Sequence, residues 1–170
     1  MAKCLIALGS NLGDRLQQLQ SAVAALKSSQ YLEVRSISAV YKTAPVGGPD
    51  NQGPYLNAAA LIETDFTAAA VLEHLHRVEA DHERERIVRW GARTLDLDLL
   101  TYDDLISDVE QLELPHPRMH LRRFVMVPVC DIAADLIHPR LGLTMQDILN
   151  DLEIVPGDLS VFDTDWVQVN

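Results

Sequence analysis

The chain has 170 residues, of which 48% are hydrophobic and 23% charged, and its formal net charge is -11. This length and composition predict one globular domain with a proper hydrophobic core. The acidic balance argues against nucleic acids and anionic membranes as partners, because both bind basic surfaces.

The two cysteines, Cys4 and Cys130, are too far apart in sequence to form a disulfide framework or a zinc motif, so we expect free thiols. The first apolar run, residues 4–8, is too short for a signal segment or a membrane span. We therefore expect a reduced, cytoplasmic setting. We expect a monomer, and a homodimer stays open.

The first part of the chain carries strand and helix patterns in turn. Residues 4–8 are uniformly apolar and end at Gly9, as in a buried strand. Apolar residues at three-to-four spacing then predict a helix over residues 12–26. Residues 31–41 are rich in β-branched and aromatic residues and predict a second strand, with a bulge or twist near Arg35.

A long loop leads into the next strand. Residues 43–54 concentrate proline and glycine, a composition that favours a loop, and long ordered loops often bind ligands. Tyr55 and Asn57 begin the strand pattern at 56–63 and point to the same side by alternation. An aromatic ring beside an amide could seat a flat heterocycle. The alternative is that Tyr55 packs in the core and Asn57 serves a turn.

A helix and a charged segment follow. Asp65 is the candidate N-cap of a helix with apolar positions through Val78. This helix leads into residues 81–86, a run of mixed charge that is typical of a solvated face or a mobile loop.

The last third of the chain predicts a rigid loop and two helices. His116 lies between two prolines, which fixes its direction. Residues 124–132 predict an apolar helix with a kink at Pro128, and Thr144 can cap a short final helix. Residues 153–170 form an acidic tail to which the pattern assigns no role.

The strand pattern at 94–102 contains two carboxylates in an otherwise apolar segment. Because side chains alternate along a strand, Asp96 and Asp98 share the face opposite the leucines. They lie about 6.5 Å apart and repel each other unless a cation neutralises them; Mg²⁺ is a cation that binds carboxylate oxygens. Arg89 and Arg93 would then lie beside an anionic ligand, which suggests metal-bound phosphate.

Other catalytic patterns are missing from the sequence. It contains no P-loop, no dinucleotide fingerprint, no nucleophile elbow and no cysteine-nucleophile motif. The strongest candidate site is therefore the carboxylate pair with its arginines. The reaction class that suits it is phosphoryl or diphosphoryl transfer, which depends on positioning and charge neutralisation.

Five short segments, taken in order, carry a likeness to a known family. They are Gly9-Ser10-Asn11-Leu12-Gly13-Asp14, Tyr41-Lys42-Thr43-Ala44-Pro45, Tyr55-Leu56-Asn57-Ala58, Arg89-Trp90-Gly91-Ala92-Arg93-Thr94-Leu95-Asp96-Leu97-Asp98 and Leu114-Pro115-His116-Pro117-Arg118-Met119. Each is weak alone, but together and in this order they resemble the 6-hydroxymethyl-7,8-dihydropterin pyrophosphokinase family.

The resemblance implies a ferredoxin-like α/β (α+β) fold: an antiparallel sheet with helices on both faces in a single domain. That domain would span residues 1–152, with residues 153–170 as the tail. The implied enzyme transfers the diphosphate of ATP to the hydroxymethyl group of 6-hydroxymethyl-7,8-dihydropterin and releases AMP, in tetrahydrofolate biosynthesis. Two Mg²⁺ ions and ATP as co-substrate are implied as well.

The resemblance also implies roles for individual residues. Asp96 and Asp98 would hold the two Mg²⁺ ions, and His116 would lie beside the phosphates. The arginines implied at the phosphates are Arg84, Arg93 and Arg122. The groups implied at the pterin are the rings of Tyr55 and Phe124, the Asn57 amide, and the backbone around Thr43 and Ala44. Trp90 would belong to a loop that closes over the site.

Some alternatives stay open at this point. Residues 81–89 differ in length from some family members, so Arg86 can replace Arg84 at the phosphates. A metal-dependent phosphohydrolase or nucleotidyltransferase could use the same carboxylates. In a non-catalytic ferredoxin-like binding module, Asp96 and Asp98 would merely be solvated.

Overall fold

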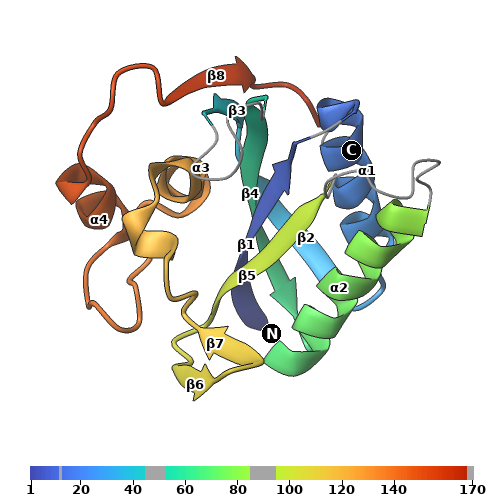
Figure 1. Cartoon of the computed structure of the whole chain (residues 1–170). Coiled ribbons are helices and arrows are strands. Elements are labelled where there is room, and N and C mark those ends of the chain that lie inside the picture. Colours follow the sequence, from blue (N-terminus) through green and yellow to red (C-terminus); the bar gives the residue numbers. More distant parts are fainter. Residues whose placement is uncertain (12, 45–52, 85–94, 168–170) are drawn as a thin grey trace.

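The computed structural model describes residues 1–11, 13–44, 53–84 and 95–167 (Figure 1). Its strands are β1 (Ala2–Ser10), β2 (Leu32–Ile37), β3 (Val40–Thr43), β4 (Tyr55–Thr64), β5 (Asp96–Tyr102), β6 (Ser107–Val109), β7 (Leu112–Leu114) and β8 (Leu159–Asp163). Its helices are α1 (Arg15–Ser28), α2 (Ala68–Arg84), the 3-10 helix η1 (Met119–Leu121), α3 (Arg123–Ala133) and α4 (Met145–Asp151).

One antiparallel sheet organises the molecule. Its strand order is β5-β1-β4-β3-β8, and β2 also pairs with β4. Helices α1 and α2 cover one face, whereas α3 and α4 cover the other (Figure 1). The expected α+β fold, with an antiparallel sheet and helices on both faces, is confirmed.

Alternation along β1 creates a hydrophobic core on each face of the sheet. Cys4, Ile6 and Leu8 pack in the core beneath α1 and α2, whereas Leu5 belongs to the core beneath α3 and α4. All four side chains are nearly inaccessible to solvent. Burial on both faces explains why the sequence of this strand is continuously apolar.

The predicted strand over 31–41 is two strands, β2 and β3, which pair with β4 one after the other. The expected bulge is confirmed, because the register shifts between Val34 and Ser36. Ser38 interrupts the segment: its N–H donates to Ala59 O over 2.9 Å, and its hydroxyl accepts from Ala59 N over 2.8 Å. These bonds stand in for the strand ladder and turn the chain into β3.

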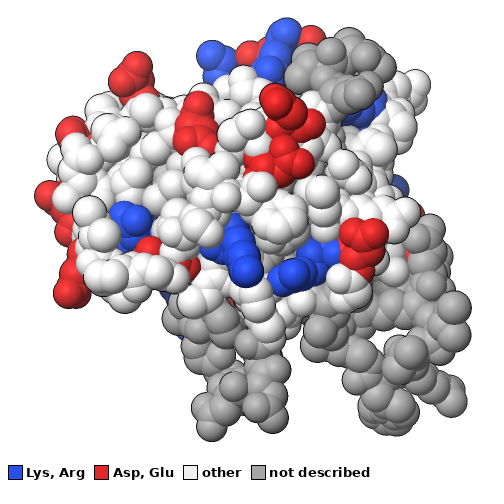
Figure 2. Space-filling model, turned by 90° about the horizontal axis from the view of Figure 1, so that it is seen from above, with Lys and Arg blue, Asp and Glu red and all other residues white. Residues whose placement is uncertain are grey.

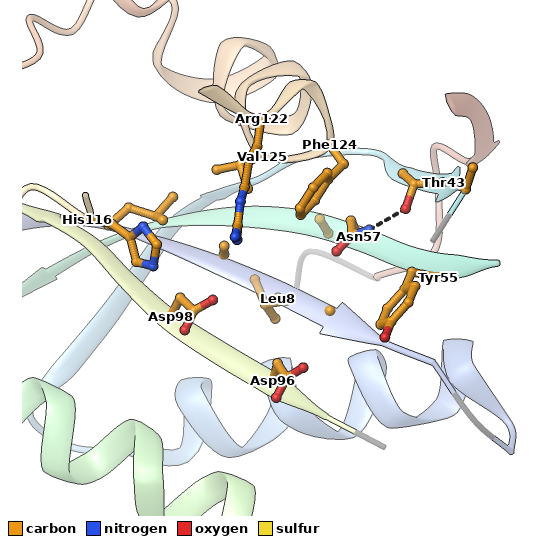
Figure 3. Close-up of a pocket in the computed structure, with 15 residues that line it drawn as sticks. Leu8, Thr43, Tyr55, Asn57, Asp96, Asp98, His116, Arg122, Phe124 and Val125 are labelled. Atoms are coloured by element: carbon orange, nitrogen blue, oxygen red, sulfur yellow. Dashed lines mark hydrogen bonds between the residues drawn. The ribbon is translucent and has the colours of Figure 1, made fainter. Parts of the chain in front are cut away.

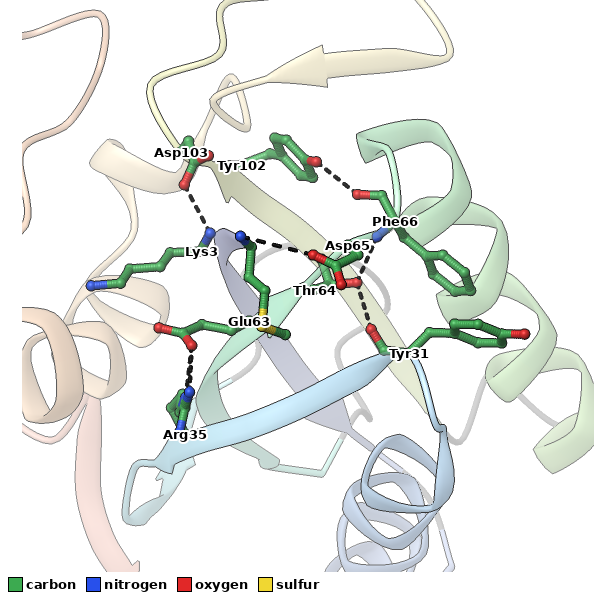
Figure 4. Close-up of polar contacts among 10 residues, drawn as sticks. Lys3, Tyr31, Arg35, Glu63, Thr64, Asp65, Phe66, Tyr102 and Asp103 are labelled. Atoms are coloured by element: carbon green, nitrogen blue, oxygen red, sulfur yellow. Dashed lines mark hydrogen bonds and ion pairs between the residues drawn. The ribbon is translucent and has the colours of Figure 1, made fainter.

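Asp65 does not cap α2, so that prediction is wrong. Thr67 fills this position, since its Oγ1 accepts from Ala70 N over 3.2 Å and its carbonyl accepts from Val71 N over 2.9 Å. Thr64 occupies the preceding turn, where its hydroxyl accepts from Phe66 N and donates to the Tyr31 carbonyl (Figure 4).

Besides the short helix η1, two parts of the fold have no counterpart in the sequence prediction. The first is the hairpin of β6 and β7, which forms a separate two-stranded sheet. The second is β8, which pairs with β3 as an outer strand of the main sheet. Trp166 then packs in the core with 5% exposure, and its indole Nε1 donates to Ser38 O over 2.8 Å. The C-terminal residues therefore complete the sheet and one of its cores.

The other local predictions agree with the structure. Thr144 caps α4 through a bond from Asp147 N, and Pro128 lies inside α3. The cap of α1 is Asp14, a residue to which the sequence prediction gave no such role. None of the helices in the described ranges is long and apolar enough to cross a membrane. Figure 2 shows one face of the surface, on which acidic and basic side chains are interspersed.

Candidate active site

The two aspartates of β5 share one face of the sheet, as alternation predicts. Leu97 and Leu99 pack in the core beneath α1 and α2, so Asp96 and Asp98 point to the side of α3. Their neighbours on β1 are small. Gly9 pairs with Asp96 and Ala7 with Asp98, which leaves open space beside both carboxylates.

A pocket of about 220 Å³ lies over these carboxylates (Figure 3). Its floor is formed by β1, β4 and β5, and its opposite wall by the start of α3. The lining residues are Ala7, Leu8, Gly9, Thr43, Ala44, Tyr55, Asn57, Ala58, Asp96, Asp98, Leu100, His116, Arg122, Phe124 and Val125.

Tyr55 and Asn57 face the pocket from β4, which confirms that they share one side of this strand. Leu56 between them is buried in the core on the other face. The amide Nδ2 of Asn57 donates to Thr43 Oγ1 over 2.6 Å. Because its nitrogen is occupied by Thr43, the amide is held in one direction at the pocket wall.

The start of α3 brings a cation and an aromatic ring into the pocket. Arg122 precedes the helix, and its guanidinium lies 5.5 Å from the centre of the Phe124 ring. In Figure 3, Arg122 and Phe124 extend from α3 toward the strand carrying Asn57. The pocket therefore combines carboxylates at its floor with a guanidinium and a ring at its opposite wall.

His116 is fixed at the end of the pocket nearest Asp98 (Figure 3). Its backbone N–H donates to Leu100 O over 2.8 Å, and its ring Nδ1 accepts from the backbone N–H of Arg118 over 3.2 Å. Burial lowers the pKa of His116; the Asp98 carboxylate opposes this shift, whereas the Arg122 guanidinium adds to it. The neutral ring, with Nδ1 as acceptor, carries its proton on Nε2.

Three predicted site residues, Trp90, Arg93 and Arg84, cannot be located in this pocket. Trp90 and Arg93 lie outside the described residues. The same holds for Arg86 and Arg89, the other arginines of this segment. Arg84 is the last residue of α2, and its side chain is also outside what the structure describes. The other predicted site residues all line the pocket: Thr43, Ala44, Tyr55, Asn57, Asp96, Asp98, His116, Arg122 and Phe124.

Sequence reasoning missed the small residues of the floor. It used Gly9 as the end of a strand and as part of a family motif, but not as a residue of the site, yet a Cβ at Gly9 would lie 3.0 Å from Asn57 Oδ1. The available signal was the alternation of Ala7 and Gly9 with larger residues in β1. Reading it required knowing that β1 runs between β4 and β5, which local patterns do not give.

The two carboxylates of the pocket suit a hard divalent cation that takes its remaining ligands from substrate and water. Asp96 and Asp98 offer carboxylate oxygens, which are the ligands that Mg²⁺ takes. Within the described ranges, no group of three or more His, Cys, Asp or Glu side chains could enclose a metal ion. Mg²⁺ commonly binds through one or two carboxylates plus phosphate and water, so two aspartates fit this ion.

The fold and the pocket together define an α+β domain whose pocket is suited to a flat ring and a metal-bound anion. The family model described as 7,8-dihydro-6-hydroxymethylpterin-pyrophosphokinase (HPPK) matches residues 5–134. The chain belongs to this family.

Individual relatives agree with the family match. A 2-amino-4-hydroxy-6-hydroxymethyldihydropteridine pyrophosphokinase of Haemophilus influenzae is 43% identical over 139 residues, covering 82% of this chain and 86% of the relative. The protein of the same name from Bacillus subtilis is 44% identical over 127 residues, covering 75% of each chain. The wild-type HPPK-DHPS structure of Plasmodium falciparum has a TM-score of 0.71 at 13% identity, covering 88% of this chain and 44% of that chain. This last likeness shows the fold alone.

Proposed function

We propose that this pocket is where the chain transfers the diphosphate of ATP to the hydroxymethyl group of 6-hydroxymethyl-7,8-dihydropterin, releasing AMP, in tetrahydrofolate biosynthesis. One observation carries the proposal: the paired carboxylates of Asp96 and Asp98 face the same pocket as the rings of Tyr55 and Phe124. Family membership supports it independently.

We place the pterin between Tyr55 and Phe124, with its polar edge toward β3. Asn57 keeps its amide oxygen for a donor on the ring, because its nitrogen is bonded to Thr43. The backbone at Thr43 and Ala44 can satisfy the remaining polar groups of the heterocycle. Such ring contacts supply orientation as well as affinity, since aromatic faces bind flat groups in few geometries.

Asp96 and Asp98 are the proposed ligands of two Mg²⁺ ions. When bound, these ions neutralise the charge on the phosphate oxygens of ATP. The aspartates would hold these ions through their carboxylate oxygens, on the pocket side of β5. Transfer forms a bond from the hydroxymethyl oxygen to the β-phosphorus and breaks the bond from the β-phosphorus to the bridging oxygen, which leaves with AMP. The proton of the hydroxymethyl group is released to solvent.

Arg122 and His116 are proposed to bind phosphate at the other end of the pocket. The guanidinium of Arg122 and the Nε2 proton of His116 are both donors, and donors fixed in a pocket stabilise charge that develops during transfer. Arg93 and either Arg84 or Arg86 would complete the phosphate contacts. Trp90 would lie on a loop that closes over the substrates and excludes water.

The experiment is an assay of AMP formation by the purified chain with ATP and Mg²⁺, with and without the pterin alcohol. The expected result is AMP and the pterin diphosphate in equal amounts, and only when the pterin is present. Release of inorganic phosphate without pterin would instead identify a phosphohydrolase.

Two further expectations have their own tests. Gel filtration of the same sample tests the expectation of a monomer, with a homodimer left open. Fractionation of the host cells tests the expected cytoplasmic location.

A further inference from the structure

The end of β3 is held between two strands. Thr43 pairs with Tyr55 of β4 on one side and with Leu159 of β8 on the other. One residue further along, Ala44 N donates to Asp158 O over 2.9 Å. The backbone at Thr43 and Ala44, which lines the pocket, is therefore fixed from the C-terminal segment.

The side chain of Asp158 reaches the other wall of the pocket. Its Oδ2 accepts from Arg123 Nε over 2.9 Å, and the two side chains are only 24% and 19% exposed. Arg123 is the first residue of α3 and stands between Arg122 and Phe124, both of which line the pocket. Low exposure reduces solvent screening, and the first turn of a helix favours a nearby negative charge.

The turn before β8 fixes Asp158 itself. Gly157 has a φ of 78°, a conformation that residues with a side chain rarely adopt. Asp158 N then donates to Val155 O over 3.1 Å. The carbonyl and the carboxylate of this one residue thus join the end of β3 to the start of α3.

We infer that Asp158 is a positioning residue for the pterin, because it sets the distance between the Thr43–Ala44 backbone and the Phe124 ring. This inference rests on the proposed function, which places the pterin between those two groups. Asp158 is not among the described residues that line the pocket, so it acts through Ala44 and Arg123. The pterin needs both walls at once, whereas ATP uses only Arg122 in this region.

The decisive variant is Asp158→Asn, which keeps the size and the carbonyl of the residue but removes its charge. We expect KM for the pterin to rise about tenfold, as for a lost charge-assisted hydrogen bond. The values of kcat and KM for ATP should change less than about twofold. Asp163→Asn is the matched control, since Asp163 is the last residue of β8, the strand that follows Asp158, and its Oδ1 accepts from Asp165 N.

A double-mutant cycle with Arg123→Gln identifies the partner. If Asp158 acts through Arg123, the double variant should weaken pterin binding no more than Asp158→Asn alone. Binding of the pterin alcohol is also measured by titration calorimetry, so that the inference is judged even without turnover. Circular dichroism and thermal unfolding establish that each variant is folded.

Three results would overturn the inference: an unchanged pterin affinity in Asp158→Asn, an equal loss in Asp163→Asn, or a fully additive cycle. Failure of the proposed function gives a different result, because the wild-type chain would then form no AMP with the pterin.

Discussion

The Asn57 amide is bonded to Thr43 across two neighbouring strands, with 2.6 Å between Nδ2 and Oγ1. Gly9 approaches the same amide from β1, since a Cβ at Gly9 would lie 3.0 Å from Asn57 Oδ1. Any side chain at Gly9 must therefore displace an amide that is already held on its other side.

Gly9→Ala tests this relationship. We expect pterin affinity to fall about tenfold, because the added methyl group pushes Asn57 out of its bonded position and costs a hydrogen bond. Calorimetric titration with the pterin alcohol measures the effect. Gly53→Ala is the control, because a Cβ there would meet none of the described atoms within 4 Å. Equal affinities in the two variants would contradict the prediction.

The aspartates of β5 are expected to be essential. Asp96→Ala or Asp98→Ala should lower kcat by at least roughly a hundredfold. Each variant removes a carboxylate that would bind Mg²⁺, and the bound ion would stabilise the negative charge that develops on the phosphate oxygens. Initial rates of AMP formation measure the loss. Asp104→Ala, an exposed aspartate in the turn after β5, should keep wild-type rates. Activity that survives in both pocket variants would leave these carboxylates as merely solvated groups.

The two aromatic residues of the pocket are expected to bind the pterin ring. Tyr55→Ala and Phe124→Ala should each weaken pterin affinity about tenfold while the fold stays intact, because each removes one stacking face. Pterin titrations with thermal unfolding as a parallel readout separate affinity from stability. Tyr31→Ala provides the comparison, since Tyr31 stacks on Phe66 at 4.7 Å and lines no part of this pocket. Unaltered pterin binding in both pocket variants would refute the stacking assignment.

His138 predicts a pH dependence of stability. Burial lowers its pKa below 6.5, with His120 and Arg140 adding to the shift, and its Nδ1 accepts from Arg140 N and Leu141 N. The unfolded chain therefore binds more protons below about pH 6.5, so the free energy of unfolding falls as the pH falls through that range. At neutral pH this contribution is fully present.

His138→Asn keeps an acceptor near the Nδ1 position but cannot be protonated. We expect it to be less stable than the wild type at pH 7.5, with the difference shrinking toward pH 5.5. Urea unfolding at several pH values measures both curves. The pKa values of His74 and His116 are lowered as well, and both residues are present in the wild type and in the variant. Each protein therefore keeps some pH dependence of stability from these two histidines. Parallel curves for the two proteins would rule out a contribution from His138.

Local pattern was sufficient to predict the central part of the site. Alternation alone placed Asp96 and Asp98 opposite Leu97, and Tyr55 on the same side as Asn57. These are properties of a single strand, so they do not depend on which strands become neighbours. The resemblance to the family supplied the residues from other elements, including Phe124 and Arg122.

The sequence prediction failed where neighbouring residues compete for one role, as at the cap of α2, and where a strand depends on a distant partner, as at β8. Thr67 replaced Asp65 as the cap of α2 because the hydroxyl of Thr64 and the turn at Phe66 already occupy the preceding residues. Strand β8 is short and partly exposed, and among the described strands it pairs only with β3. These two strands lie far apart in the sequence, so a local pattern around β8 does not reveal its partner.

The pairing of β1 has a consequence for the order of folding. Leu5 donates to Thr101, 96 residues further along the chain, and β1 lies between β4 and β5. During synthesis β1 therefore emerges long before either neighbouring strand exists, and its backbone has no strand to pair with until β4 has been made. Separations of this size slow folding, so chaperones that bind nascent apolar segments would have their longest opportunity at this strand.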